Sequence, residues 1–370
     1  MTYSKPGYPK LVTDLNKLRE NIETVKNLCD ARGVEIAGVI KGCTGLFPCV
    51  QQYEKAGVKY IASSRLEQLA ELKSRGIQTP LAMIRVPMIS EAEDVVRYCE
   101  YSLNSELSVL ETLNMHAGRQ DKIHNVILMA DLGDLREGWW DKDEMVRAAI
   151  AVENEMKNLH LAGVGMNVGC YGSIVATPEK IEELVAIAQA VENAIGRELE
   201  IISGGATSSL MRVYDGNLPE RVNMLRIGEA ILLSYDLPHL YGYECSGMHQ
   251  DVFTIQAEVI EVKDKPSHPV GEIGFDAFGH RVEYVDRGIR RRALIGLGKC
   301  DYGDPGDLLP RMEGVEILGA SSDHTILDIQ DAVDAGRDIK VGDVLEFDLK
   351  YSTMVYLTNS PNVAKVFIQP

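Results

Sequence analysis

The sequence predicts an α/β chain built as a TIM (β/α)8 barrel with a C-terminal all-β domain. Eight short apolar stretches alternate with helical patterns in the first part of the chain, which is the alternation of a parallel barrel. From about residue 245 the helical periodicity nearly disappears, and apolar runs are separated by Gly, Pro and Asp. A doubly wound parallel sheet produces the same alternation, so it remains the second interpretation of the first part.

The expected barrel elements follow in order. Apolar residues from Leu15 to Leu28 at helical spacing predict a first helix, which Thr13 or Asp14 can cap. The segment 64–67, Ser-Arg-Leu-Glu, has the pattern of a capping box and predicts the start of a later helix. The barrel strands are expected at 34–41, 58–62, 80–85, 100–103, 123–131, 160–168, 199–203 and 223–226.

The second domain is expected to consist of strands joined by turns. We place the barrel at residues 13–244 and the β domain at 245–370, with residues 1–12 as a candidate additional strand of the β domain. The expected strands of this domain are 252–262, 292–297, 315–318, 326–329, 344–349 and 363–368.

Composition excludes several classes of protein. The chain has 370 residues and a net charge of −17, which repels phosphate backbones and argues against nucleic acid as a partner. Its apolar runs are shorter than a bilayer span, so no membrane partner is expected. The N-terminal residues lack the apolar core of a signal peptide, and seven Cys without a CxxC pair read as reduced thiols, so a cytoplasmic protein is expected.

Polar side chains follow the ends of several expected strands, where a TIM barrel builds its active site. They are Lys41, Asp131 with Arg136, Asn167, the turn 203–205, and Arg226 with Gly228. A lysine in apolar surroundings has a lowered pKa and can form a Schiff base. Glycine and hydroxyl-bearing residues before a helix offer their backbone N–H groups to a phosphate. The set predicts a site for an aldehyde cofactor that bears a phosphate.

These segments resemble a known family. Gly38-Val39-Ile40-Lys41-Gly42 resembles the lysine motif of the alanine racemase-like fold type III pyridoxal-phosphate enzymes. The segments 131–138 and 225–229 are similar to the family's Asp-Thr-Gly-x-x-Arg-x-Gly and Arg-x-Gly segments. The likeness covers nearly the whole chain. Within the family, the chain most resembles racemases of ornithine and other basic amino acids, in segments 85–88, 203–205, 271–279 and 319–324.

The resemblance implies roles for individual residues. Lys41 would hold pyridoxal 5'-phosphate, Arg226 would lie at its ring nitrogen, and Arg136 would contact the cofactor phenolate or the substrate carboxylate. An arginine at the ring nitrogen keeps that atom unprotonated and weakens the electron sink, which suits racemisation. The remaining cofactor contacts are expected from Asn167, where the family has a histidine, and, at the phosphate, from Thr207, Ser208, Gly228, Glu229 and Tyr351.

Racemisation needs a proton carrier on each face of the reacting carbon. Lys41 serves one face, and the family draws the other from the β domain of a partner subunit, which implies a homodimer. In the matching loop, Lys299, Cys300 and Tyr302 all remain candidates, with Lys299 favoured. Asp323, in the similar segment 319–324, is a further candidate catalytic residue. No metal site is expected, because the zinc-site partner ligands of related dehydratases are missing near residues 350–352.

The resemblance leaves alternatives to an amino-acid racemase, which is an isomerase. A basic amino-acid decarboxylase shares the fold, although its glycine-rich phosphate segments match poorly. A pyridoxal-phosphate carrier protein is a single barrel, and the residues from about 245 onward argue against it.

Overall fold

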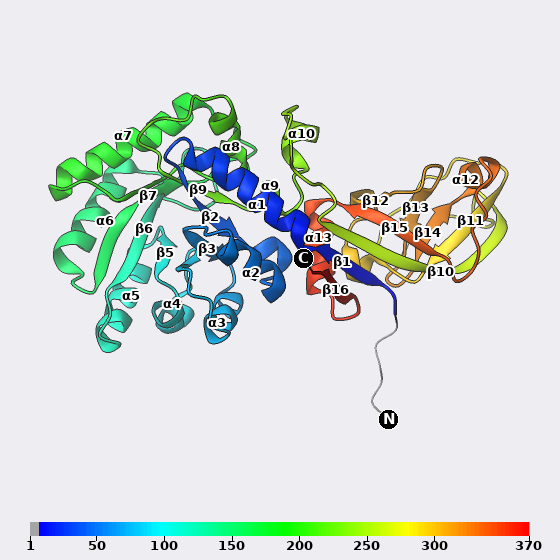
Figure 1. Ribbon diagram of the computed structural model, residues 1–370, viewed down its shortest axis with the longest axis horizontal. Coiled ribbons are helices and arrows are strands. Elements are labelled where there is room, and N and C mark those ends of the chain that lie inside the picture. The colour runs from blue at the N-terminus through cyan, green and yellow to red at the C-terminus, as the bar shows by residue number, and fades with distance from the viewer. Residues whose placement is uncertain (1–6, 370) are drawn as a thin grey trace. The chain divides into compact units, whose positions relative to one another are not determined.

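Eight parallel strands close into a barrel (Figure 1). The computed structural model describes residues 7–369. Neighbouring strands pair in chain order, and the first pairs with the last, with Glu35 opposite Met224. The closed ring confirms the TIM barrel and excludes a doubly wound sheet. The strands are β2 (Glu35–Val39), β3 (Tyr60–Ser63), β4 (Leu81–Met83), β5 (Tyr101–Asn104), β6 (His124–Ala130), β7 (Leu159–Met166), β8 (Ile201–Ser203) and β9 (Met224–Ile227).

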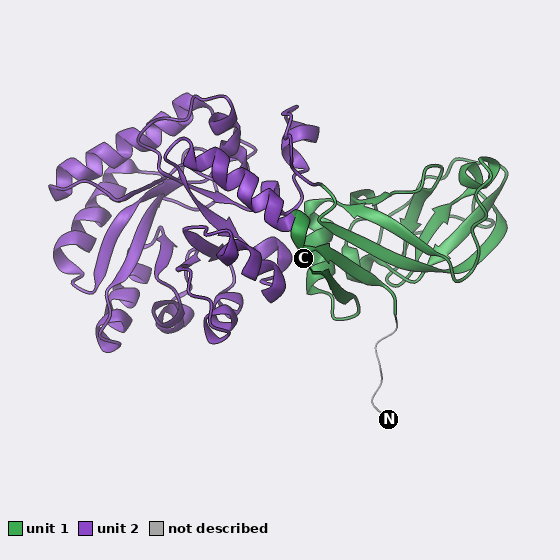
Figure 2. Ribbon diagram, viewed as in Figure 1, with its two compact units in different colours: residues 1–17, 250–370 green, residues 18–249 purple. Residues whose placement is uncertain are grey.

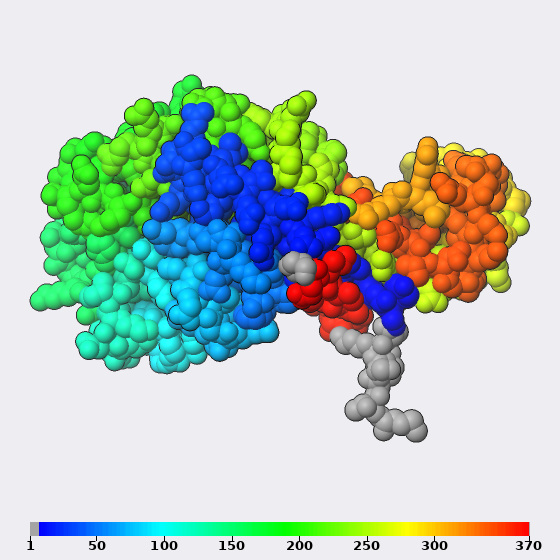
Figure 3. Space-filling view, in the orientation of Figure 1, coloured from blue at the N-terminus to red at the C-terminus, as the bar shows by residue number. Residues whose placement is uncertain are grey.

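Helices follow the strands and surround them (Figure 1). Figure 3 shows the same residues in space-filling form, coloured along the chain from blue to yellow-green. The α-helices are α1 (Leu15–Asp30), α2 (Phe47–Lys55), α3 (Leu66–Ser74), α4 (Ala92–Tyr98), α5 (Leu107–Arg119), α6 (Lys142–Glu155), α7 (Pro178–Ile195), α8 (Thr207–Tyr214), α9 (Glu229–Leu232) and α10 (Asp236–Leu240). Two 3-10 turns, η1 (Lys41–Cys43) and η2 (Ile89–Glu91), follow β2 and β4.

Local chemistry sets the helix ends. Asp14 Oδ1 accepts the N–H groups of Asn16 and Lys17 at 2.9 and 3.2 Å, as expected for a cap of α1. The expected capping box at 64–67 is wrong, because α3 begins at Leu66 and Arg65 takes the cap position without a side-chain bond. Ser63, the last residue of β3, instead accepts the N–H of Arg65 and bonds Gln68.

Small residues fill much of the barrel interior. The inward-facing core contains Ala37, Ala62, Ala82 and Ala162 beside larger side chains such as Met129. Gly163 is required between β7 and β8, because a Cβ atom there would lie 2.0 Å from the carbonyl oxygen of Ile201. Close strand contact therefore depends on the missing side chain.

The second compact unit is a mostly antiparallel sheet (Figure 2). Its strands are β1 (Lys10–Asp14), β10 (Phe253–Pro266), β11 (Ile289–Ile295), β12 (Leu308–Pro310), β13 (Glu316–Ala320), β14 (Thr325–Asp328), β15 (Val344–Leu349) and β16 (Ala364–Ile368). Strand β1 pairs with β10 and β16, while residues 1–6 of the candidate N-terminal strand and residue 370 lie outside the described residues. This unit comprises the chain up to Lys17 and from Gln250 onward, and the barrel unit is Leu18–His249. The barrel therefore begins five residues after the expected start at 13, and the β unit resumes five residues after the expected border at 245.

This unit is not purely β. Three short helices, α11 (Lys299–Tyr302), α12 (Gln330–Asp334) and α13 (Tyr351–Asn359), and the 3-10 turn η3 (Pro305–Asp307) interrupt the sheet. Helix α13 does not separate polar from apolar residues, because its buried face includes Thr353 and Thr358 while Tyr356 is exposed. A helix of this kind lacks the amphipathic pattern that a sequence reveals.

Candidate active site

The barrel residues expected at the site lie where strands end. Lys41 lies two residues past β2, Asn167 directly follows β7, and the turn after Ser203 leads from β8 into α8. Arg226 and Gly228 lie at the end of β9, and Arg136 lies in the loop between β6 and α6. All parallel strands of a barrel point the same way, so these side chains gather at one end of it.

Lys41 opens the 3-10 turn η1, which Ile40 separates from β2. The N–H of the preceding Ile40 still bonds the carbonyl oxygen of Ala62 on β3, at 2.9 Å, so the turn is fixed to the barrel. Burial lowers the pKa of Lys41, and the positive charges of Arg136 and Arg226 lower it further, against the opposing effects of Cys170 and Glu137. A lysine with a lowered pKa is suited to attack a carbonyl group.

Arg226 is the buried cation of the site. Its Nη2 donates to the carbonyl oxygen of Met166, at the end of β7, at 2.6 Å, and its Nη1 donates to Ser203 Oγ, at the end of β8. Burial lowers the pKa of Arg226 to about 10. The guanidinium thus holds three strand ends together through neutral oxygen atoms.

Arg136 is a more exposed cation on the loop after β6. It forms a two-pronged ion pair with Glu137, with Nη2 to Oε1 at 2.6 Å, and its side chain is 39% exposed. Asp131 shapes the start of this loop, since its Oδ1 accepts the N–H groups of Gly133 and Leu135. Gly138 closes it with φ +127°, and a Cβ atom there would lie 2.4 Å from the backbone nitrogen of Asp131.

The residues expected at a phosphate lie where two helices begin. Thr207 and Ser208 are the first two residues of α8, and Gly228 and Glu229 lie at the start of α9. Thr207 Oγ1 accepts the N–H of Ala230 at 3.3 Å, which ties the two helix starts together. The first N–H groups of a helix have no partner within it, and they attract anions.

Glu229 is expected to offer a phosphate only its backbone N–H group. Its side chain is buried, and Oε1 accepts the N–H groups of Tyr235 and Asp236 at 2.8 and 3.1 Å, while Oε2 has no hydrogen-bond partner among residues 7–369. Burial raises the pKa of Glu229 to about 7. Only its backbone N–H group therefore suits a phosphate.

The donor set fits a phosphate-bearing aldehyde. Asn167 is 8% exposed, and its Nδ2 is buried without a hydrogen-bond partner in the described part of the chain. Buried amide groups are normally satisfied, so this donor suits a bound ligand. Lys41 supplies an amine for an aldehyde, and the starts of α8 and α9 supply donors for a phosphate. The residues present thus fit pyridoxal 5'-phosphate.

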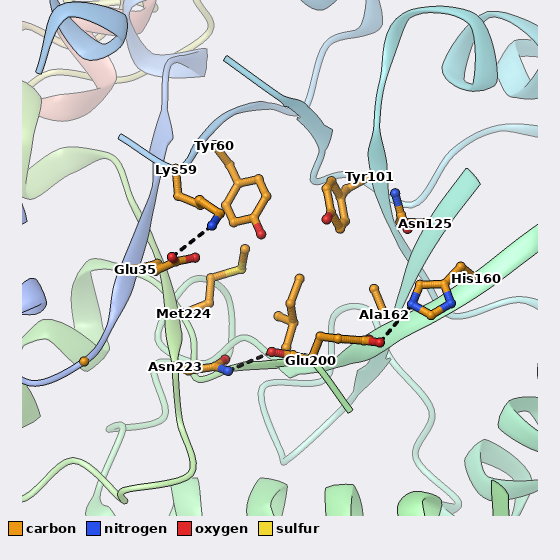
Figure 4. Close-up of a pocket in the computed structure, with 12 residues that line it drawn as sticks. Glu35, Lys59, Tyr60, Tyr101, Asn125, His160, Ala162, Glu200, Asn223 and Met224 are labelled. Atoms are coloured by element: carbon orange, nitrogen blue, oxygen red, sulfur yellow. Dashed lines mark hydrogen bonds and ion pairs between the residues drawn. The ribbon is translucent and has the colours of Figure 1, made fainter. Parts of the chain in front are cut away.

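A cavity of about 440 Å³ opens at the amino ends of the strands, away from these residues (Figure 4). Its charged lining groups bond one another, with Glu35 to Lys59 and His160 to Glu200, each at 3.1 Å. Lys41 lies beyond the other end of β2 from Glu35. The cavity is therefore separate from the candidate active site.

The β unit carries the three candidates for the second proton carrier. Lys299 Nζ lies 4.2 Å from the ring centroid of Phe278. Cys300 is exposed, its Sγ donates to Asp323 Oδ1 at 3.7 Å, and burial of the sulfur together with Asp301 and Asp323 raises its pKa to about 11. Tyr302 is fully buried, and its hydroxyl shares a 2.7 Å hydrogen bond with Thr325 Oγ1. Of the three candidates, Cys300 is exposed, Lys299 is half-buried and Tyr302 is enclosed.

Two further expected residues also lie in the β unit. Asp323 accepts a hydrogen bond from Ser322 at 2.6 Å in addition to that from Cys300. Tyr351 opens α13 directly after Lys350. All seven cysteines, each within residues 7–369, are free of disulfides.

Sequence reasoning missed two residues of the barrel unit, Asp134 and Cys170. Asp134 lies in the loop of Arg136, and Cys170 lies three residues after Asn167. Cys170 is exposed, and in its thiolate form it would raise the pKa of Lys41, Arg136 and Arg226. The glycines on both sides of Cys170-Tyr171 were a signal for a tight turn at this strand end.

None of the helices within residues 7–369 combines the length and apolarity that a membrane crossing requires. Residues 7–369 also contain no group of three or more His, Cys, Asp or Glu arranged to hold a metal ion.

The fold is that of solved alanine racemases. The structure of alanine racemase from a D-cycloserine-producing Streptomyces lavendulae matches with a TM-score of 0.78 and 16% identity, over 99% of this chain and 98% of that one. Alanine racemase from Streptomyces coelicolor matches with a TM-score of 0.75, also at 16% identity, over 98% of each chain. At such identities the likeness establishes the fold alone.

The chain belongs to the alanine racemase family. Residues 13–236 match the sequence model of the family described as "Alanine racemase, N-terminal domain". Ornithine racemase of Acetoanaerobium sticklandii is 40% identical, over 94% of this chain and 96% of that protein. Lysine racemase of Thermotoga maritima is 39% identical, over 97% of this chain and 98% of that protein. Both relatives are racemases, which are isomerases.

Proposed function

We propose that the protein is a pyridoxal-phosphate-dependent racemase that interconverts the L and D forms of ornithine or another basic amino acid. The position of Lys41 carries the proposal, because it combines the end of a barrel strand, burial and two neighbouring arginines. The identities of 40% and 39% with racemases of ornithine and lysine support a basic substrate.

Lys41 would bind the cofactor and carry a proton on one face of the substrate. When bound, the cofactor would withdraw electrons from the substrate and make its Cα proton acidic. Burial lowers the pKa of Lys41, so its neutral form is more populated at neutral pH than that of an exposed lysine. A neutral Nζ can accept the proton from Cα, and the resulting ammonium can return it.

The other barrel residues would bind and orient. The starts of α8 and α9, with Thr207, Ser208 and Gly228, would hold the phosphate. Arg226 would lie at the ring nitrogen, where a fixed positive charge opposes protonation and moderates electron withdrawal. Arg136 would bind the carboxylate of the substrate, which then competes with Glu137 for the same guanidinium.

The opposite face would be served by Lys299 from the β unit of a partner subunit in a homodimer. Cys300 is a weaker candidate, because a thiol with a pKa of about 11 is almost wholly protonated at neutral pH. Tyr302 is weaker still, because its buried hydroxyl is already bonded to Thr325. The same unit would supply Asp323 as a further catalytic residue and Tyr351 as a contact to the phosphate.

Deuterium exchange separates the racemase from the alternatives. The protein, loaded with pyridoxal phosphate, is incubated with L-ornithine in deuterated water. We expect D-ornithine that carries deuterium at Cα, with L-lysine turned over more readily than L-alanine. Release of CO2 would identify a decarboxylase, and absence of any exchange a carrier protein; either result contradicts the proposal. Lys41→Ala serves as the inactive control.

A further inference from the structure

The carboxylate of Asp134 joins two loops at the carboxyl end of the barrel. Asp134 lies between β6 and α6 and is 1% exposed. Its Oδ1 accepts the N–H groups of Gly169 at 2.9 Å and Gly172 at 3.0 Å, and its Oδ2 accepts that of Tyr171 at 3.0 Å. These three donors lie in the loop between β7 and α7 and enclose Cys170 on both sides.

These bonds suit a fixed turn. Hydrogen bonds to a buried carboxylate are charge-assisted and stronger than those between neutral groups. Gly172 permits the close approach, because a Cβ atom there would lie 2.7 Å from the carbonyl oxygen of Asp134. Strands β6 and β7 are hydrogen-bonded neighbours, so both ends of the link rest on the rigid barrel.

The same turn packs against the start of α8. Ser208 Oγ donates to the carbonyl oxygen of Val168 at 2.8 Å. A Cβ atom on Gly169 would lie 3.2 Å from Ser208 Cβ, so the two segments are in close contact. Asp134 thereby connects the loop of Arg136 to the helix start proposed for the phosphate.

Cys170 stands at the centre of this arrangement. It is exposed, and a thiolate at this position would raise the pKa of Lys41, Arg136 and Arg226, so it lies near all three. Asn167, at the start of the same loop, has the buried Nδ2 that lacks a partner among residues 7–369. An accessible thiol and an unsatisfied amide thus flank the place where the lysine and the two arginines converge.

We infer that Asp134 is a positioning residue, which fixes the Cys170 turn at the edge of the cofactor site so that the Cys170 thiol borders the bound cofactor. The identity of that cofactor rests on the proposed function, whereas the clamp by Asp134 does not. In Asp134→Asn, one of the three N–H groups would face an amide donor instead of an acceptor, so the turn would loosen.

Thiol labelling tests the inference on the full-length protein. Iodoacetamide reacts with accessible thiols, and peptide mass spectrometry follows Cys170 and Cys300 separately. In the wild type, pyridoxal phosphate should slow labelling of Cys170 by at least about fivefold. Asp134→Asn, compared at cofactor concentrations that saturate its absorbance spectrum, should lose most of this protection.

Glu192→Gln is the matched control. Glu192 is a buried carboxylate on α7 that accepts the N–H of Leu199 at 2.9 Å and pairs with Arg221, near the other end of the barrel. This variant should keep the protection of Cys170 whatever its stability. Equal protection in Asp134→Asn and the wild type, or equal loss in Glu192→Gln, would overturn the inference.

Hydrogen exchange on the wild type keeps the test independent of how the variants fold. The amides of Gly169, Tyr171 and Gly172 should exchange far more slowly than that of Trp140, an exposed residue of the loop between β6 and α6, with or without cofactor. Rapid exchange of all three would overturn the clamp. A wild type that binds no pyridoxal phosphate would instead contradict the proposed function and the role of Cys170, and slow exchange would still support the clamp.

Discussion

Arg226 on β9 donates to the carbonyl oxygen of Met166 at the end of β7, reaching across the end of β8, where it also bonds Ser203. A single buried guanidinium therefore ties three neighbouring strand ends at the active-site end of the barrel. Because it is the same group that we place at the ring nitrogen of the cofactor, the stability of the barrel end and the chemistry of the site depend on one residue.

Replacing Arg226 should affect both properties. Arg226→Ala leaves the buried oxygen atoms of Met166 and Ser203 without their donor, and we expect a loss of about 3 kcal/mol in the free energy of unfolding. Arg226→Lys retains the charge but cannot present two fixed donors, so it should recover only part of the stability and shift the absorbance of bound pyridoxal phosphate. Urea unfolding and absorbance spectra measure the two effects, and a lysine variant identical to the wild type in both would contradict them.

Glu229 should make stability fall as the pH rises. Burial raises its pKa from 4.5 to about 7, so the folded protein holds the proton more tightly than the unfolded chain does. Between these two pH values the unfolded chain releases the proton of Glu229 while the folded protein keeps it. The free energy of unfolding therefore falls as the pH rises, by roughly 3 kcal/mol by pH 8. Urea unfolding at pH 5 and pH 8 should reveal this loss.

Glu229→Gln should remove most of that loss and be the more stable protein at pH 8. Its amide oxygen can still accept the N–H groups of Tyr235 and Asp236. Burial also raises the pKa of Asp236, so a smaller dependence of the same sign should remain. A glutamine variant that keeps the full dependence would assign the effect to another group.

The second proton carrier can be identified from a variant that exchanges the Cα proton of only one enantiomer. Lys299→Ala should lose racemisation in both directions but keep deuterium exchange, with retention of configuration, for the enantiomer whose proton faces Lys41. Cys300→Ala should keep most of its turnover, because its thiol is protonated at neutral pH. Nuclear magnetic resonance of the Cα proton in deuterated water follows both. The opposite pattern would assign the second face to Cys300.

Strand positions in the barrel were predictable because buried parallel strands are short apolar runs between helical patterns. The rule that barrel sites lie at strand ends then led directly to Lys41, Asn167 and Arg226. Closure of the ring, which separates a barrel from a doubly wound sheet, depends on β2 meeting β9 almost two hundred residues later, with Glu35 opposite Met224. A local pattern contains no such information.

Side-chain partnerships were the least predictable part. The Ser64 capping box failed because Ser63, one residue earlier and at the end of β3, already bonds Arg65 and Gln68. Glu229 was expected only for its N–H group, since its burial depends on the path of the chain from 229 to 236. The link from Asp134 to residues 169–172 joins two loops more than thirty residues apart, so neither loop reveals it alone.

Covalent trapping tests the central claim most directly. The protein loaded with pyridoxal phosphate is reduced with borohydride, digested and mapped by mass spectrometry. The account predicts that the cofactor becomes fixed to Lys41 Nζ and that Lys41→Ala retains none under the same treatment. Trapping at a different lysine in the wild type, or undiminished trapping in Lys41→Ala, would contradict it.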